Sequence, residues 1–326
     1  MIVKKRSNGR NLVALGLLVL VLNVVIVTVA FAQKELSFYF NPPDGTSFVE
    51  TLRYTKSVSS QGVLQPETQV IEQKARYMIR KTATGYSIVV TPILPILRVS
   101  EGVEGLIRSM FSAVVVTYDL NMEGKLVRVR GTEQLMDKLR EIFPQEMVQI
   151  ALSTLGQAAQ DPAKLAAVGY ENRGMLGMFA GRTLKLDHVY QGTGNVPLPF
   201  GGSTVGTMKI KISWPTPCSG RRCARVESMY ESTDKAIGER MALMLRKMLI
   251  DVAKAIDPSF DVEKIPHFQV TEPRSTLDNK RLVDPTTGLI YSENETKTLQ
   301  AFFAVETQDR SKLVIKEMSE YSYEYQ

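Results

Sequence analysis

Residues 207–232 read TMKIKISWPTPCSGRRCARVESMYES and contain both cysteines of the chain. Apolar and polar residues alternate from Thr207 to Trp214, and the alternation resumes over Ala224–Ser232. A period of two residues is typical of a β-strand with one buried face. Prolines and a Ser-Gly pair separate the two runs and favour a turn. The stretch therefore predicts a β-hairpin with one cysteine on each side of its loop.

Cys218 and Cys223 could bind a metal, carry redox chemistry or form a disulfide. A zinc site needs further soft ligands, and the chain offers only two histidines, His188 and His267. Thioredoxin-type chemistry uses C-x-x-C at a helix start, whereas four residues separate this pair between prolines. The two arginines between the cysteines would lower a thiol pKa, which keeps a reactive cysteine as an alternative. In an exported protein, opposed strands favour a disulfide, and this is what we predict.

The N-terminus has the pattern of a secretory signal. Four basic residues within the first ten are followed by an apolar run over residues 12–29, and Ala30-Phe31-Ala32 provides small residues for a cleavage site. We expect residues 1–32 to be removed and residues 33–326 to act in the periplasm or outside the cell. The alternative is an uncleaved anchor through residues 12–32, because about 20 apolar residues can span a bilayer.

The positive charge of the chain lies mainly in this leader. The formal net charge of +6 falls to +2 without residues 1–32, which hold four basic and no acidic residues. A nucleic-acid binder normally carries a dense basic surface, so we expect no nucleic-acid partner. No second long apolar run follows residue 32, so no membrane span is expected after signal removal.

Strand and helix patterns come in two blocks of similar order. Each block has alternating runs first, then a helical section, then a strand–turn–strand unit. In the first block these are strands within 46–99, a short helix at 101–111, a hairpin at 113–130 and helices over 132–169. In the second they are strands within 182–232, a helix at 234–256, a turn at Asp284-Pro285, and strands at 298–306 and 312–325.

This order predicts an α+β protein. We expect a large, curved, mostly antiparallel sheet, half-barrel-like, with amphipathic helices packed on its concave side. Its two halves, residues 33–181 and 182–326, would be pseudo-repeats, or one continuous domain.

The helix at 234–256 has the clearest amphipathic pattern. Apolar residues recur along it at spacings of three or four, which indicates one buried stripe. Methionines adapt to irregular apolar partners, which suits an acyl chain, although they also fill ordinary cores. The glycine-rich apolar segment at 173–182 is interpreted as a lid or a buried loop. The predicted lining of an apolar cavity is Met241, Met244, Leu245, Met248, Val252, Met175, Met178 and Phe179.

An exported curved sheet with apolar helices across its mouth resembles the outer-membrane lipoprotein-carrier (LolA-like) family of half-barrel envelope proteins. The resemblance covers about residues 34–326 and rests on the order and character of the elements. It implies a carrier or sensor of acyl chains with an apolar cavity beneath the helices. The chain is longer than that family's members and has no diagnostic motif, so no binding residue is transferred.

No catalytic signature is found. His188 follows Asp187, but the nearest serine-containing turn, GGSTVG at 201–206, lacks the G-x-S-x-G spacing. We interpret His188 as a half-buried packing residue on a strand. The sequence contains no phosphate-binding loop, H-E-x-x-H motif or EF-hand pattern, so no catalytic residue, metal or cofactor is predicted.

We therefore expect a non-enzymatic binding or carrier module for an apolar, lipid-like ligand of the cell envelope. The alternative is a structural or interaction protein with a solid core. In that case the tyrosine-rich end YSYEY, residues 321–325, would form an edge strand that pairs with an envelope protein partner.

Overall fold

A computed structural model describes residues 34–326 apart from several internal segments. These segments are 61–62, 95–113, 134–136, 138–140, 142–160, 162, 165, 168–169, 171–178, 199–202, 257–258, 266–267 and 306–309. The predicted signal or anchor, residues 1–32, and most of the helical section predicted for 132–169 lie outside the described residues.

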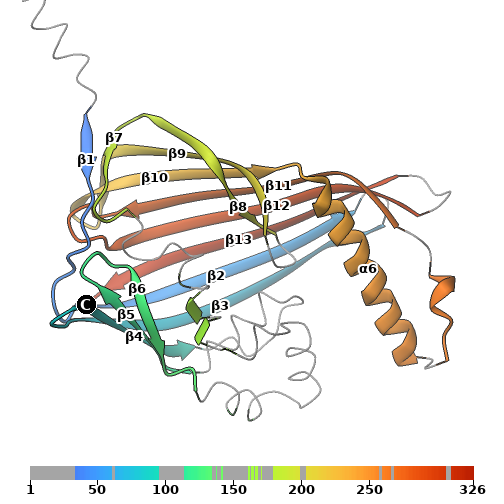
Figure 1. Ribbon diagram of the computed structural model, residues 1–326, viewed down its shortest axis with the longest axis horizontal. Helices are drawn as coiled ribbons and strands as arrows, with labels where there is room; N and C mark the ends of the chain where they lie inside the picture. Colours follow the sequence, from blue (N-terminus) through green and yellow to red (C-terminus); the bar gives the residue numbers. More distant parts are fainter. Residues whose placement is uncertain are drawn as a thin grey trace, which may run out of the picture.

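One antiparallel sheet of eleven strands dominates the described chain (Figure 1). Its strands are β2 (Ser47–Ser60), β3 (Val63–Lys81), β4 (Gly85–Leu94), β5 (Val116–Asn121), β6 (Leu126–Arg130), β8 (Val189–Pro197), β9 (Ser203–Cys218), β10 (Arg221–Ser232), β11 (Phe268–Val283), β12 (Ile290–Val305) and β13 (Ser311–Tyr325). A two-stranded sheet pairs β1 (Glu35–Ser37) with β7 (Thr183–Lys185). The alternation of apolar and polar residues therefore predicted the large antiparallel sheet correctly.

The strand order across the sheet is β6-β5-β4-β3-β2-β13-β12-β11-β10-β9-β8. Strands β2 to β6 form one meander and strands β8 to β13 form another. Pairing of β2 with β13 joins them into one continuous sheet, which is curved and not closed, with β6 and β8 at its edges (Figure 1). Both predicted halves thus contribute to the same sheet.

The C-terminal strand occupies the middle of this sheet and not its edge. Tyr321 of β13 is in register with Glu293 of β12 on one side and with Leu52 of β2 on the other. The prediction that YSYEY offers a free edge was wrong, because local composition does not reveal which distant strand will pair with it.

The helix α6 (Lys235–Ile256) begins one residue later than predicted and ends where predicted, and a 3-10 turn, η2 (Val262–Lys264), follows it. α6 lies at one end of the sheet and contacts mainly β11 (Figure 1). The described residues of 163–170 are also helical, and Tyr170 packs on Tyr118 of β5 with ring centroids 4.9 Å apart. The prediction of several amphipathic helices along the concave side is not met by the described residues, in which α6 is the one long helix.

We call the more buried face of the sheet the inner face. Its buried apolar side chains form two larger clusters and, between them, a small one of Leu52, Tyr54 and Tyr321. The aromatic cluster lies where β2 begins and β13 ends, and it includes Phe48, which stacks on Tyr77 at 4.8 Å. Phe40 also belongs to it, and Gly124 leaves room for its ring, because a Cβ there would lie 2.7 Å from Cγ of Phe40. The second cluster, which we call the helix-end cluster, consists of Leu198, Ile237, Met241, Leu299 and Ala301.

Candidate functional site on the inner face of the sheet

Charged and polar side chains cross the inner face between the aromatic cluster and the helix-end cluster, next to the small apolar cluster of Leu52, Tyr54 and Tyr321. These side chains are buried or nearly so, and the most exposed of their charged groups, Lys56, is 17% exposed. We call them the charged belt: Glu50, Lys56, Asn279, Arg281, Glu293, Glu295, Lys297 and Glu317.

Strand pairing places these residues next to one another. Glu317 of β13 is in register with Lys56 of β2 on one side and with Lys297 of β12 on the other. Glu293 is in register with Arg281, and Glu295 with Asn279. Alternate residues of a strand share one face, so these groups lie on the same side of the sheet as the apolar clusters.

The inner face of β12 changes from charged to apolar within one pleat. Its inward residues are Glu293, Glu295 and Lys297, followed by Leu299 and Ala301 of the helix-end cluster. Two residues along a strand are about 7 Å apart. A polar group and an apolar surface therefore adjoin at the α6 end of the belt.

The centre of the belt is a hydrogen-bonded ion pair. Arg281 Nη2 donates to Glu293 Oε1 at 2.7 Å, and the Asn279 amide donates to the same oxygen at 2.7 Å. Burial alone would lower the pKa of the Arg281 guanidinium, but the charge of Glu293 and its hydrogen bond outweigh burial and raise that pKa. Arg281 therefore stays charged inside the sheet.

Two lysines complete the belt toward the α6 end. Lys297 Nζ lies 3.4 Å from Glu295 Oε1, and Lys56 Nζ lies 3.4 Å from Glu317 Oε1. At the other end of the belt, the Tyr77 hydroxyl donates to Glu50 Oε1 at 3.3 Å. Burying a charge lowers stability unless the charge is paired and hydrogen-bonded. A sheet with a structural role alone would be more stable with apolar residues at these positions.

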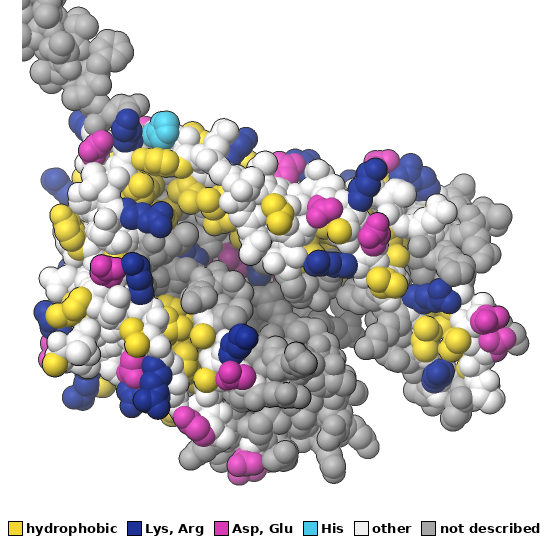
Figure 2. Space-filling model, viewed as in Figure 1, with side chains coloured by type: hydrophobic (Ala, Val, Ile, Leu, Met, Phe, Trp, Pro, Cys, Tyr) yellow, Lys and Arg dark blue, Asp and Glu magenta, His cyan; other side chains and the backbone are white. Residues whose placement is uncertain are grey.

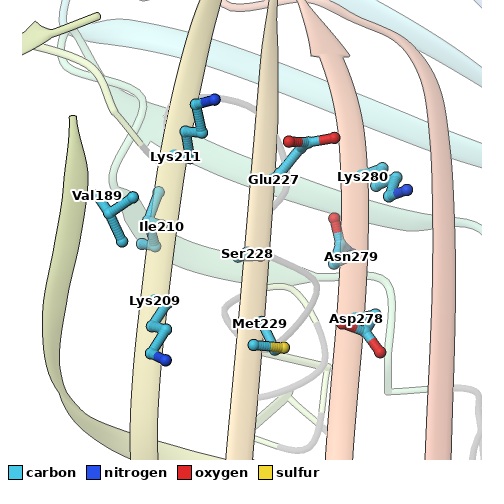
Figure 3. A pocket seen from close by; sticks show the side chains of 10 residues that line it. All are labelled: Val189, Lys209, Ile210, Lys211, Glu227, Ser228, Met229, Asp278, Asn279 and Lys280. Carbon is cyan, nitrogen blue, oxygen red and sulfur yellow. The ribbon is translucent and has the colours of Figure 1, made fainter. Parts of the chain in front are cut away.

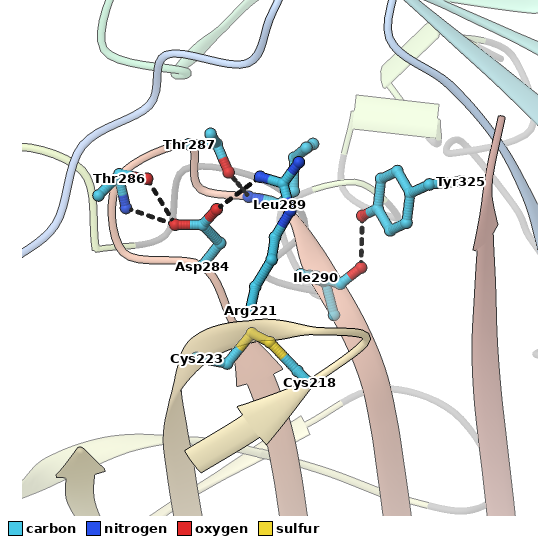
Figure 4. The surroundings of a disulfide bond; sticks show 9 residues. All are labelled: Cys218, Arg221, Cys223, Asp284, Thr286, Thr287, Leu289, Ile290 and Tyr325. Atoms are coloured by element: carbon cyan, nitrogen blue, oxygen red, sulfur yellow. Dashed lines mark hydrogen bonds and ion pairs between the residues drawn. A yellow bond between two sulfur atoms is a disulfide. The ribbon is translucent and has the colours of Figure 1, made fainter. Parts of the chain in front are cut away.

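The predicted disulfide joins Cys218 and Cys223 at the tip of the β9–β10 hairpin, with Cα atoms 5.8 Å apart (Figure 4). Arg221 in the same loop lies 3.6 Å from Asp284 in the β11–β12 turn. Asp284 in turn accepts hydrogen bonds from the backbone and hydroxyl of Thr286, at 2.8 and 2.6 Å. The disulfide therefore fixes a loop that holds the neighbouring turn, which is a structural role, and it fits an oxidising compartment.

A shallow groove of about 260 Å³ lies on the opposite, outer face, across β8 to β11 (Figure 3). Glu227 on β10 is flanked in register by Lys211 and Lys280. The three side chains lie in one row across β9, β10 and β11, and the negative charge of Glu227 partly neutralises the two lysines. We assign no ligand to this groove.

Three of the residues predicted to line an apolar cavity have described side chains, and Phe179 lies in a different cluster from Met241. Met241 is buried in the helix-end cluster and Leu245 is half-buried farther along α6, whereas Phe179 packs on Phe38 in the aromatic cluster, with ring centroids 5.4 Å apart. Met175 and Met178 lie outside the described residues. For Met244, Met248 and Val252 the structure describes the helix backbone alone.

His188 is not the half-buried strand residue that the sequence suggested. It is exposed, next to Asp187 in the turn between β7 and β8, and its ring meets that of Tyr190 edge-on at 4.7 Å. Among the described residues, no three His, Cys, Asp or Glu side chains are grouped so that they could hold a metal ion.

The charged belt was missed because polar residues on a strand are normally assigned to the solvent face. A signal was present in β12, where Glu293, Glu295 and Lys297 have the same parity as Leu299 and Ala301. A strand whose apolar and charged residues share one parity cannot have a purely apolar buried face.

No protein-family model matches the sequence, and no curated protein matches it. None of the helices in the described part of the chain combines the length and the hydrophobicity that a membrane span requires.

Proposed function

We propose that the protein is an exported, non-enzymatic carrier or binding module for a lipid-like ligand of the cell envelope. The resemblance to the LolA-like carriers motivated this idea from sequence. The charged belt beside an apolar cluster supports an amphiphilic ligand, with a polar headgroup and an apolar chain.

The observation that carries the proposal is the position of the charged belt beside the helix-end cluster. A headgroup at Lys56, Lys297 and Glu317 would meet both signs of charge in a low-dielectric setting, where polar contacts are strong. The attached chain would extend over Leu299 toward Met241 on α6. Binding sites commonly combine such an apolar wall with a few placed polar groups.

Native mass spectrometry of the exported protein, followed by solvent extraction, tests the proposal. We expect a population with added mass and an amphiphilic lipid in the extract. A bare mass under all conditions, with an empty extract, would argue against any carrier function.

Paired variants locate the ligand. Lys56→Met/Glu317→Gln removes one ion pair of the belt with little change in volume. The matched control, Arg274→Met/Glu231→Gln, removes an outer-face pair whose atoms lie 2.8 Å apart. We expect the first variant to lose bound lipid and the control to retain it, with circular dichroism showing that both are folded. Equal retention would place the ligand elsewhere.

A structural or interaction protein with a solid core is the second candidate. Burial at both ends of the inner face favours it, since Phe48 and Ile88 in the aromatic cluster and Leu299 and Met241 in the helix-end cluster are each at most 1% exposed. A ligand-free protein that recovers an envelope partner from a pull-down would support this candidate over the carrier.

A further inference from the structure

The helix α6 is held on the sheet by its first two turns. Ile237 and Met241 are buried in the helix-end cluster at 0% and 1% exposure. Gly238 brings the helix against β11, because a Cβ there would lie 2.8 Å from the Val270 carbonyl oxygen. Arg240 Nη1 donates to the Ser203 carbonyl at 2.9 Å. These contacts fix the start and direction of the helix.

Farther along, α6 exposes large apolar side chains. Leu243 is 69% exposed and Leu249 is 37% exposed. Figure 2 shows hydrophobic side chains on the lobe where α6 lies, with Lys and Arg and also Asp and Glu beside them. Single exposed leucines are ordinary, but two on one helix call for an occupant when the charges around them also share a sign.

The charges around these leucines are mainly positive. Arg240 and Arg246 lie three residues before and three residues after Leu243, so that both neighbour it on the helix surface, and Leu249 lies three residues beyond Arg246. Residues 243–256 of the helix carry three basic residues and one acidic residue, a net charge of +2. A helix with exposed leucines among basic residues has the composition of one that lies in a bilayer interface.

We propose that the second half of α6, residues 243–256, docks on an anionic lipid bilayer surface. The exposed leucines would insert at the headgroup level, and the basic residues would face the anionic headgroups, each contributing attraction that falls with salt. This docking does not depend on the lipid-carrier proposal, because it concerns an outer surface of the helix and not the charged belt.

An environment-sensitive fluorophore on Leu243→Cys tests the docking in the exported protein, since the native cysteines are joined to each other. The matched control is the same probe on Val127→Cys, because Val127 is also 69% exposed but lies on the edge strand β6. With vesicles of phosphatidylcholine and phosphatidylglycerol, we expect a blue shift at position 243 and none at position 127. Salt should reverse the shift, and pure phosphatidylcholine should not produce it.

Two further variants measure how much single side chains of α6 contribute to vesicle affinity. Leu249→Ser and Lys254→Gln should each weaken vesicle affinity about fivefold, whereas Lys316→Gln on the outer face of β13 should not. The proposal is overturned by an unshifted probe at position 243, which would leave a protein partner as the occupant. It is equally overturned by similar shifts at both positions or with neutral vesicles. None of these outcomes bears on lipid recovered from the inner face, so the two proposals can fail separately.

Discussion

Glu293 accepts hydrogen bonds at one carboxylate oxygen from Asn279 and Arg281 on the neighbouring strand. Both Glu293 and Arg281 are buried, so each charge depends on the other for compensation. Removing one partner of a buried ion pair typically costs more than replacing the whole pair by apolar groups. The charged belt therefore affects stability mainly when a substitution removes one partner and leaves the other charge buried and unpaired.

Glu293→Leu should lower the free energy of unfolding by about 3–5 kcal/mol, because Arg281 would remain buried without its carboxylate. Adding Arg281→Met should recover most of this loss. Urea denaturation of both variants measures the difference. The control, Glu231→Leu, removes the partner of the exposed Arg274 and should cost less than about 1 kcal/mol. If the double variant is less stable than Glu293→Leu, the pair is a net stabiliser and this account is wrong.

At the scale of elements, the start of α6 is set by Asp234. Its carboxylate accepts a hydrogen bond from the Ala236 backbone N–H at 3.0 Å and from the Thr204 hydroxyl at 2.9 Å. The backbone hydrogen bond and then the Thr204 hydroxyl lower the pKa of Asp234. The ionised cap thus joins the helix to the first residues of β9.

Because the folded pKa of Asp234 is lowered, its stabilisation is complete above the unfolded pKa of about 3.9. It is lost as the pH falls through the folded pKa below that value. We expect hydrogen exchange in residues 235–245 to accelerate below about pH 4, after correction for intrinsic rates. Asp234→Asn can cap without titrating, and it should remove this pH dependence. Unchanged dependence in that variant would assign the effect to another carboxylate.

Gly238 is the point of closest approach between α6 and the sheet. Replacing a helical glycine by alanine usually gains about 1 kcal/mol. Here the added Cβ would meet the Val270 backbone oxygen at 2.8 Å, and backbone cannot move as a side chain can. We expect the clash to prevail, so Gly238→Ala should speed hydrogen exchange along α6 and lower the melting temperature. Ala242→Gly, one turn later, gives an upper bound on the propensity effect, because it combines the propensity loss with the loss of a half-buried methyl group.

Elements with local signals could be predicted from sequence. The hairpin around Cys218 and Cys223, the turn from Asn121 to Gly124 and the span of α6 all follow from periodicity and turn residues within a few positions. The charged belt could not be predicted as a site, because its members lie on four strands, and their proximity depends on strand pairing.

At the scale of the molecule, the sheet is completed by its last strand. β13 pairs with β2 from Leu313↔Ser60 to Tyr325↔Phe48, and with β12 on its other side. The Tyr325 hydroxyl donates to the Ile290 carbonyl at 2.5 Å, and burial raises the pKa of that hydroxyl, so it stays a donor. The two meanders thus meet through the C-terminus, a long-range pairing that no short stretch of sequence encodes.

Deletion of residues 319–326 should therefore unfold the sheet. The loss removes inward Tyr321, which is 5% exposed, together with about half of the register pairs with β2 and a third of those with β12. Unpaired buried backbone groups cannot be compensated locally. We expect loss of the near-ultraviolet circular dichroism signal and rapid proteolysis of the truncated protein.

Substitutions at two neighbouring residues of β13 show whether the stability of the sheet depends on the buried side chains of this strand. Tyr321 points to the inner face and Glu320 to the outer face, one residue apart on the same strand. Tyr321→Ser should cost about 3 kcal/mol in urea denaturation, because it empties a packed site, whereas Glu320→Ser should stay within about 0.5 kcal/mol of the parent. A truncated chain that keeps its fold, together with equal effects of the two substitutions, would mean that β13 is a dispensable edge after all. Such a result would restore the C-terminus as a surface for a partner strand.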